Sequence, residues 1–142
     1  MTHTALAAAD APGTPTNDAG YHPGVCNIGP AEIARRRRAG HVGALATVGL
    51  FTVLVALDAP PLARLTVALP AAVAASGYLQ AWLKFCAGFG SRGTFNFGPL
   101  GRVDEVTDPE ARARDRAKAT QIGLASLGIG IAVGVVAVLV PR

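Results

Sequence analysis

Three long stretches of the chain are apolar and almost free of charge, and they constrain the fold more than any other feature. They cover residues 42–59, 62–84 and 122–140, and most of the charged residues lie between them. An α-helix rises about 1.5 Å per residue, so about 20 apolar residues cross a hydrocarbon core of about 30 Å. The sequence therefore predicts an all-α integral membrane protein with three transmembrane helices.

A water-soluble fold agrees poorly with this pattern. Only 15% of the residues are charged, whereas soluble domains carry about 25%. A core helix of a soluble protein usually has a polar face. In the third apolar stretch the only polar side chain is Ser126.

The segments outside the apolar stretches divide into three parts. Residues 1–24 have no apolar periodicity and are predicted to form a mobile tail. Residues 25–41 are predicted to be a basic helix that starts at Pro30 and leads into the membrane. Residues 85–121 are predicted to form a glycine-rich loop followed by a second basic helix.

Local signals refine these helices. Thr107 and Glu110 fit a capping box at the start of the second basic helix. Pro70 lies inside the second apolar stretch and is expected to bend that helix. The first and third transmembrane helices are thus expected to extend beyond the membrane as basic segments.

The positions of lysine and arginine predict the orientation. Short loops rich in these residues stay in the cytoplasm. Four lie before the first span and seven lie between the second and third, whereas the opposite side has only Arg64 and Arg142. We therefore expect a cytoplasmic N-terminus and a cytoplasmic long loop in a multi-pass protein of the bacterial inner (plasma) membrane.

Basic residues beside apolar spans are expected to contact anionic lipid headgroups. A net charge of +4 does not indicate nucleic acid here, because no soluble basic face with base-reading side chains is visible. The candidate headgroup contacts are Arg35, Arg36, Arg37, Arg38, Arg92, Arg112 and Arg116.

Small residues recur every four positions in the third span, at Ser126, Gly130 and Gly134. Such a stripe lets a second helix approach closely. We therefore predict that these three residues pack against another helix.

The two cysteines are the main candidates for chemistry. Cys26 and Cys86 are both expected near the cytoplasmic membrane surface, where His22 and His41 also lie. Two thiolates and two imidazoles match a tetrahedral zinc set, although neither cysteine has a close ligand partner in the sequence. Inert thiols, a redox or disulfide pair and a palmitoylation site remain as alternatives.

Three functional interpretations follow, and the residues identify no cofactor for any of them. The first is a non-catalytic subunit or assembly factor of a larger membrane complex, with a membrane protein or a second copy as partner. The second is a cytoplasm-facing redox or metal-binding protein that uses Cys26 and Cys86. The third is a component of an oligomeric transporter or channel, although no ionisable residue lies in the middle of a span. The run Gly88–Gly93 matches G-x-G-x-x-G but follows an apolar helix, which argues against nucleotide binding.

Overall fold

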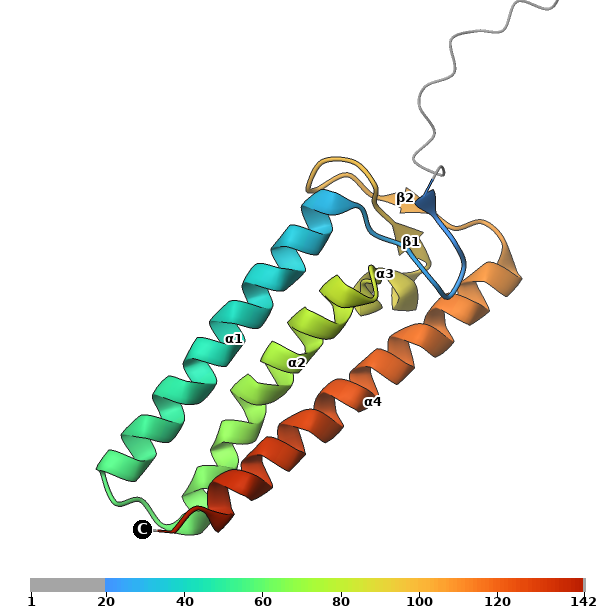
Figure 1. Ribbon diagram of the computed structural model, residues 1–142. Coiled ribbons are helices and arrows are strands. Elements are labelled where there is room, and N and C mark those ends of the chain that lie inside the picture. The colour runs from blue at the N-terminus through green and yellow to red at the C-terminus, as the bar shows by residue number, and fades with distance from the viewer. Residues whose placement is uncertain (1–19, 142) are drawn as a thin grey trace, which may run out of the picture.

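Three long helices lie side by side in the computed structural model, which describes residues 20–141 (Figure 1). α1 spans Pro30–Ala56, α2 spans Ala68–Trp82 and α4 spans Pro109–Leu139, and a 3₁₀ helix, η2 (Pro61–Val67), leads into α2. α1, η2 together with α2, and α4 are each long and apolar enough to cross a membrane. The predicted helical class and the three long apolar helices are therefore confirmed.

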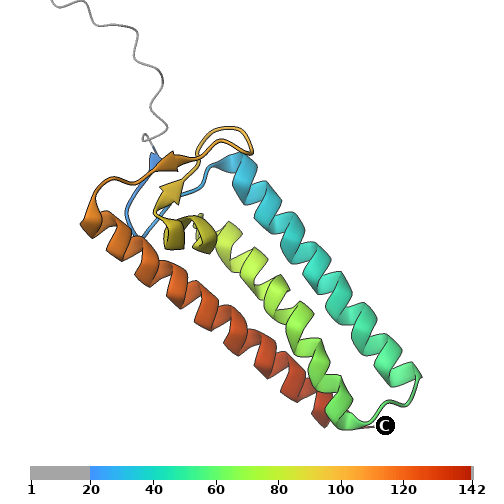
Figure 2. The same ribbon diagram turned by 180° about the vertical axis from the view of Figure 1, so that it is seen from behind.

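α2 is the middle helix of the layer, between α1 and α4 (Figures 1 and 2). Its contact with α1 depends on small residues. A Cβ atom added to Gly43 would lie 2.6 Å from the backbone nitrogen of Ala74, and one added to Gly77 would strike the backbone of Gly40. The two backbones therefore approach more closely than side chains at these positions would allow.

The predicted stripe on α4 packs against the side of η2–α2 that lies opposite α1. A Cβ atom on Gly130 would lie 2.6 Å from the carbonyl oxygen of Ala68, and one on Gly134 would lie 2.9 Å from the Cβ of Ala68. Ser126 is buried, and its hydroxyl donates to the carbonyl of Ile122 within α4. The partner of this stripe is therefore the helix pair η2–α2 of the same chain.

One end of the layer is covered by shorter elements, which we call the cap: residues 20–29 and 83–108 (Figure 1). The cap contains α3 (Ala87–Arg92) and two antiparallel strands, β1 (Thr94–Phe95) and β2 (Asp104–Glu105). Part of the predicted glycine-rich loop is thus helical. Of the predicted tail, residues 1–19 lie outside the described residues, and residues 20–24 belong to the cap.

Helix starts follow from capping chemistry. The predicted capping box is wrong in its N-cap, because Asp108 and not Thr107 accepts hydrogen bonds from the backbone of Glu110 and Ala111. Pro109 occupies the first turn, where its missing N–H costs nothing. Near Pro70 the chain changes from the 3₁₀ helix to α2, two residues before the proline.

α1 and α4 are longer than a bilayer core requires. Their 27 and 31 residues correspond to about 40 Å and 46 Å, against a core of about 30 Å. The additional turns lie toward the cap and carry the basic residues of both helices (Figure 1).

Candidate functional site

Asn27 joins the two main segments of the cap. Its side chain is fully buried and pairs with both backbone groups of Cys86: Nδ2 donates to the carbonyl at 3.1 Å, and Oδ1 accepts from the amide at 2.6 Å. Its own backbone bonds to Lys84 and Asn96. One asparagine therefore ties residues 20–29 to the end of α2 and the start of α3.

Asn96 is the second fully buried amide, and it shapes the turn after β1. Nδ2 donates to the carbonyl of Pro99 at 3.0 Å, and Oδ1 accepts from the amide of Gly98 at 2.8 Å. The carbonyl of Asn96 accepts from the amide of Gly29. A Cβ atom on Gly29 would lie 2.9 Å from the Cα of Phe97, so this crossing requires glycine.

Asp115 connects α4 to the N-terminal part of the cap. The carboxylate is fully buried and accepts from the Tyr21 hydroxyl and from the Gly24 amide, each at 2.7 Å. The Tyr21 ring stacks on Phe95 at a centroid distance of 4.8 Å. Burial raises the pKa of Tyr21 well above its usual value, and the hydrogen bond and charge of Asp115 add to this.

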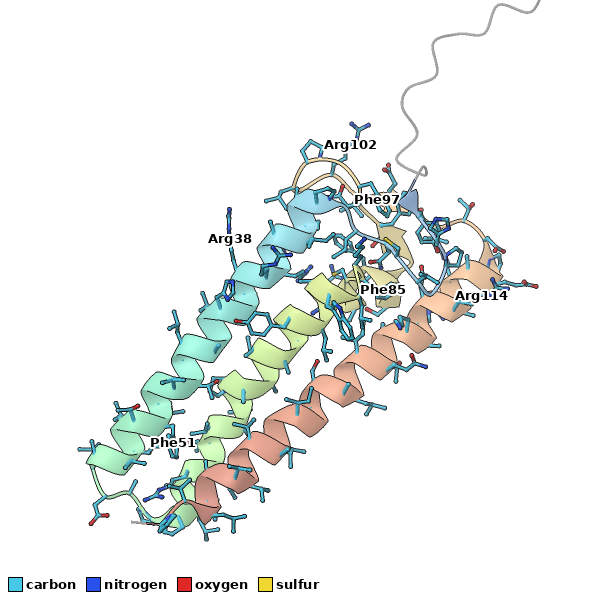
Figure 3. The ribbon with its side chains drawn as sticks, in the orientation of Figure 1. Arg38, Phe51, Phe85, Phe97, Arg102 and Arg114 are labelled. Carbon is cyan, nitrogen blue, oxygen red and sulfur yellow. The ribbon has the colours of Figure 1, made fainter. Side chains whose placement is uncertain are left out.

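The phenylalanines of the glycine-rich stretch pack inside the cap. Phe95 is buried with Val106 and Ala111, and Phe97 packs against the same cluster. Figure 3 shows Phe97 beneath the cap's outer loop and Phe85 where the cap meets the helices. Phe95 and Phe97 therefore belong to a small hydrophobic core of the cap, whereas Phe85 packs against Ala119 and Ile122 of α4.

Cys86 lies at the centre of a polar cluster. Its sulfur accepts from Nη2 of Arg36 at 2.8 Å and from the amide of Phe89 at 3.4 Å, which makes it the N-cap of α3. The residue is only 2% exposed. Glu32 completes the cluster, with ion pairs to Arg35 at 3.6 Å and to Arg36 at 3.8 Å.

This cluster is only partly satisfied within the described residues. Glu32 is 1% exposed, yet its Oε2 has no hydrogen-bond partner among them, and the same holds for Nε of Arg36. A buried carboxylate without full hydrogen bonding is costly. The buried charge of Glu32 therefore depends on its ion pairs with the guanidinium groups of Arg35 and Arg36.

The four residues of the predicted zinc set each make separate contacts. Cys26 is half-buried near the carbonyl of Ile28, and the backbone of His22 pairs with that of Cys26. The His41 ring bonds to the hydroxyl of Tyr78 at 2.7 Å. Both cysteines are free, and no three His, Cys, Asp or Glu side chains within residues 20–141 form a group able to hold a metal.

The predicted headgroup arginines fall into two groups. Arg36 and Arg112 make internal contacts: Arg112 donates to the carbonyl of Val106 and packs over Gly93. The other group is exposed at the cap end of the helices and in the cap. Its members are Arg35, Arg37, Arg38, Arg92 and Arg116.

Arg64 marks the opposite end of the layer. It is 1% exposed, and its Nη1 donates to the carbonyl of Val140 at 2.9 Å. The guanidinium thus holds η2 to the end of α4.

The comparisons with family models, curated proteins and solved structures found no match to this chain.

Proposed function

We propose that this chain is a multi-pass inner-membrane protein that serves as a non-catalytic subunit or assembly factor of a larger membrane complex, with its cap in the cytoplasm. The observation that carries the proposal is the one-sided packing of α1. Its most apolar window is 11% buried, against 33% for η2–α2 and 28% for α4. α1 is thus the helix with most surface left for another protein.

The exposed side chains of α1 are large and apolar. Val42 and Leu45 are 67% and 74% exposed. Gly40 and Gly43 of α1 lie against α2, whereas Val42 and Leu45 point away from that contact. Val42 and Leu45 lie three residues apart and form part of a ridge, and the ridges of one helix pack into the grooves of a partner helix.

The polar groups of the cap support a structural role. The buried side chains of Asn27, Asn96 and Asp115 bond chiefly to backbone groups and hold segments in place. The Gln80 amide bonds within α2 and accepts from the amide of Ala87, so it positions α3. Each of these side chains uses its hydrogen-bonding groups to hold segments of the cap in place.

The test is purification from native membranes in mild detergent, with a photo-crosslinking residue at Leu45 on α1 or at Leu124 on α4. Both side chains are well exposed, at 74% and 66%. We expect one membrane protein in stoichiometric amount, crosslinked from Leu45 and not from Leu124. Recovery of a monomer that crosslinks only lipid from both positions would contradict the proposal. A crosslinked product of twice the chain mass would replace it with a homo-oligomer.

A second candidate function, a thiol that reacts with small oxidants, is favoured by the contacts of Cys86. An anionic sulfur would accept both the Arg36 and the Phe89 hydrogen bonds. Its attack on hydrogen peroxide would form a sulfenic acid and release hydroxide. Low exposure of the sulfur admits only small oxidants.

This candidate is tested in protein with Cys26→Ser, where Cys86 is the remaining thiol. We expect hydrogen peroxide to add the mass of one oxygen atom to this protein, followed by intact mass spectrometry, at a rate about tenfold or more lower when Arg36→Gln removes the donor. Protein with Cys86→Ser is the control for reaction at Cys26. Equal rates with and without Arg36 would remove this candidate.

A further inference from the structure

A continuous groove follows one face of the α1–α2 pair from the cap toward the far end of the layer. Its first hollow, of about 490 Å³, is lined by Arg37, Trp82 and Lys84, and the next is lined by Arg37, Trp82, His41 and Tyr78. Tyr78 also lines the third hollow. Adjoining hollows share residues, so they form one groove.

The lower half of the groove is apolar. Its floor is made of α2 residues such as Ala71 and Ala74, and its walls are Val48 on α1 and Val133 on α4. Val48 and Val133 continue into the last hollow, which Phe51 also lines. α4 thus closes the lower half from the side, while the upper half lies between α1 and α2 alone.

The residues that line the groove on α1 follow a helical spacing. On α1 they include positions 34, 37, 41, 44, 48 and 51, which alternate steps of three and four, and Pro30, Ile33 and Thr47 lie beside them. Residues with that spacing share one face of a helix. From Arg37 to Phe51 the groove extends about 21 Å, which exceeds the roughly 15 Å of one leaflet's hydrocarbon.

The upper end of the groove carries positive charge. Arg37 and Lys84 are exposed, and within the part of the chain that the structure describes neither side chain makes an ion pair, because Glu32 pairs with Arg35 and Arg36. Lys84 adopts a φ of 53°, a left-handed conformation that few residues other than glycine adopt. The hydrogen bond from Asn27 to its carbonyl helps to hold this turn at the end of α2.

The depth of these cations fits the headgroup region. Nineteen residues separate Arg37 from Ala56, the last residue of α1, and they span about 29 Å, close to the hydrocarbon thickness of about 30 Å. Trp82 is 79% exposed beside Arg37, as tryptophans at the membrane interface are. The bonded pair of His41 and Tyr78 lies about one helical turn further from the cap.

A groove with two cations at its headgroup end and an apolar channel below complements a molecule with an anionic head and a long apolar chain. We propose that it binds an anionic phospholipid, with the phosphate between Arg37 and Lys84 and an acyl chain in the groove walled by α1 and α4. The site rests on the membrane insertion proposed above. It adds a defined lipid position to that function and does not depend on a protein partner.

Trp82 is the only tryptophan of the chain and reports on the site directly. The full chain in nanodiscs is titrated with phosphatidylglycerol or phosphatidylcholine that carries bromine near the top of its acyl chains, and Trp82 quenching is measured. Each cation near an anionic lipid is worth about fivefold in affinity. We therefore expect half-maximal quenching by phosphatidylglycerol at a mole fraction up to about thirtyfold lower.

Two double variants carry the same loss of charge. Arg37→Gln with Lys84→Gln should bring the ratio of the two half-maximal mole fractions to about one. Arg38→Gln with Arg102→Gln should keep the wild-type ratio, because Arg38 points away from α2 and Arg102 lies in the cap loop (Figure 3). Far-UV circular dichroism checks that both variants are folded.

Each remaining result overturns the proposal in a distinct way. Equal quenching by the two lipids in the wild type, or an equal loss in both double variants, would leave only general surface attraction. Displacement by inorganic phosphate would indicate a site for free anions. Absence of quenching by either lipid would instead contradict membrane insertion, and with it the proposed function.

Discussion

Asp115 lies within the basic segment of α4, and its carboxylate holds residues 20–24 against that helix. Replacement by alanine removes the acceptor for both Tyr21 and Gly24. Hydrogen bonds to a charged group each contribute about 1.5–3 kcal/mol, part of which water restores once the segment detaches. For Asp115→Ala we expect a loss of about 2 kcal/mol in the free energy of local opening, or about thirtyfold faster amide exchange in residues 20–29.

Tyr21→Phe is the matched control, because it removes one of the two hydrogen bonds and keeps the ring stacked on Phe95. Its exchange should lie between those of the wild type and Asp115→Ala. Hydrogen exchange followed by mass spectrometry measures all three proteins. Unchanged protection in Asp115→Ala would show that the segment is held by its apolar contacts alone.

The raised pKa of Tyr21 predicts a pH dependence. Burial and the neighbouring Asp115 favour the neutral phenol in the folded chain, so its pKa lies above the unfolded value of about 10. The stability that this tyrosine contributes is therefore complete below pH about 10 and is lost as the pH rises beyond that value. In Tyr78→Phe protein, Tyr21 is the only tyrosine left, and absorbance at alkaline pH should show its ionisation above pH 10 and together with unfolding. A midpoint near 10 in folded protein would contradict the buried hydrogen bond.

Burial of single charged residues could not be predicted from the sequence. Asp115 stands among Arg112, Arg114 and Arg116 and looks like part of a solvated helix face. It is buried because a segment 91 residues away covers it. Arg64 likewise follows two prolines at a predicted membrane surface, and its burial depends on the last turn of α4.

At the scale of elements, the long helices were predictable because hydropathy alone marks a run of about 20 apolar residues. α3 was not, since glycines at positions 88 and 90 argue against a helix on propensity. Two local features outweigh that propensity: the N-cap at Cys86 and the left-handed C-cap at Gly93, with a φ of 69°. Gly90 also packs against Phe85, where a larger residue would collide.

The glycines of α1 give a sharp test of helix packing. Gly43→Ala places a Cβ atom 2.6 Å from the backbone nitrogen of Ala74, so the helices must separate. We expect a cost of about 1–3 kcal/mol, as for other overpacked contacts. Among the described residues nothing lies within 4 Å of a Cβ added to Gly49 in the same helix, so Gly49→Ala should be neutral or slightly stabilising. Thermal unfolding in detergent micelles compares the two variants, and equal midpoints would rule out close α1–α2 packing.

At the scale of the molecule, the order of the helices in the layer could not be predicted. Each long helix is apolar on most sides, so its sequence does not show which face meets which neighbour. The fold of the cap could not be predicted either. Asn27 pairs with Cys86, 59 residues later, and hydrogen bonds between residues so far apart leave no periodic pattern in the sequence. The predicted small-residue stripe on α4 was visible, but its partner within the chain was not.

The distribution of exposed charge predicts the orientation of the whole molecule. Basic residues crowd the cap and the helix turns next to it, whereas at the opposite end Arg64 is buried and bonded to Val140. Loops rich in lysine and arginine remain in the cytoplasm. A green fluorescent protein inserted at the exposed turn of Leu100 and Gly101 should therefore fluoresce, because it folds in the cytoplasm and fails to fold after export. Alkaline phosphatase fused after Pro141 should be active, since it needs the periplasm to form its disulfides. A dark fluorescent protein at Gly101 together with an inactive phosphatase at Pro141, with both fusions present in the membrane, would mean that the cap faces outward, and the basic end of the molecule would then need another explanation than topology.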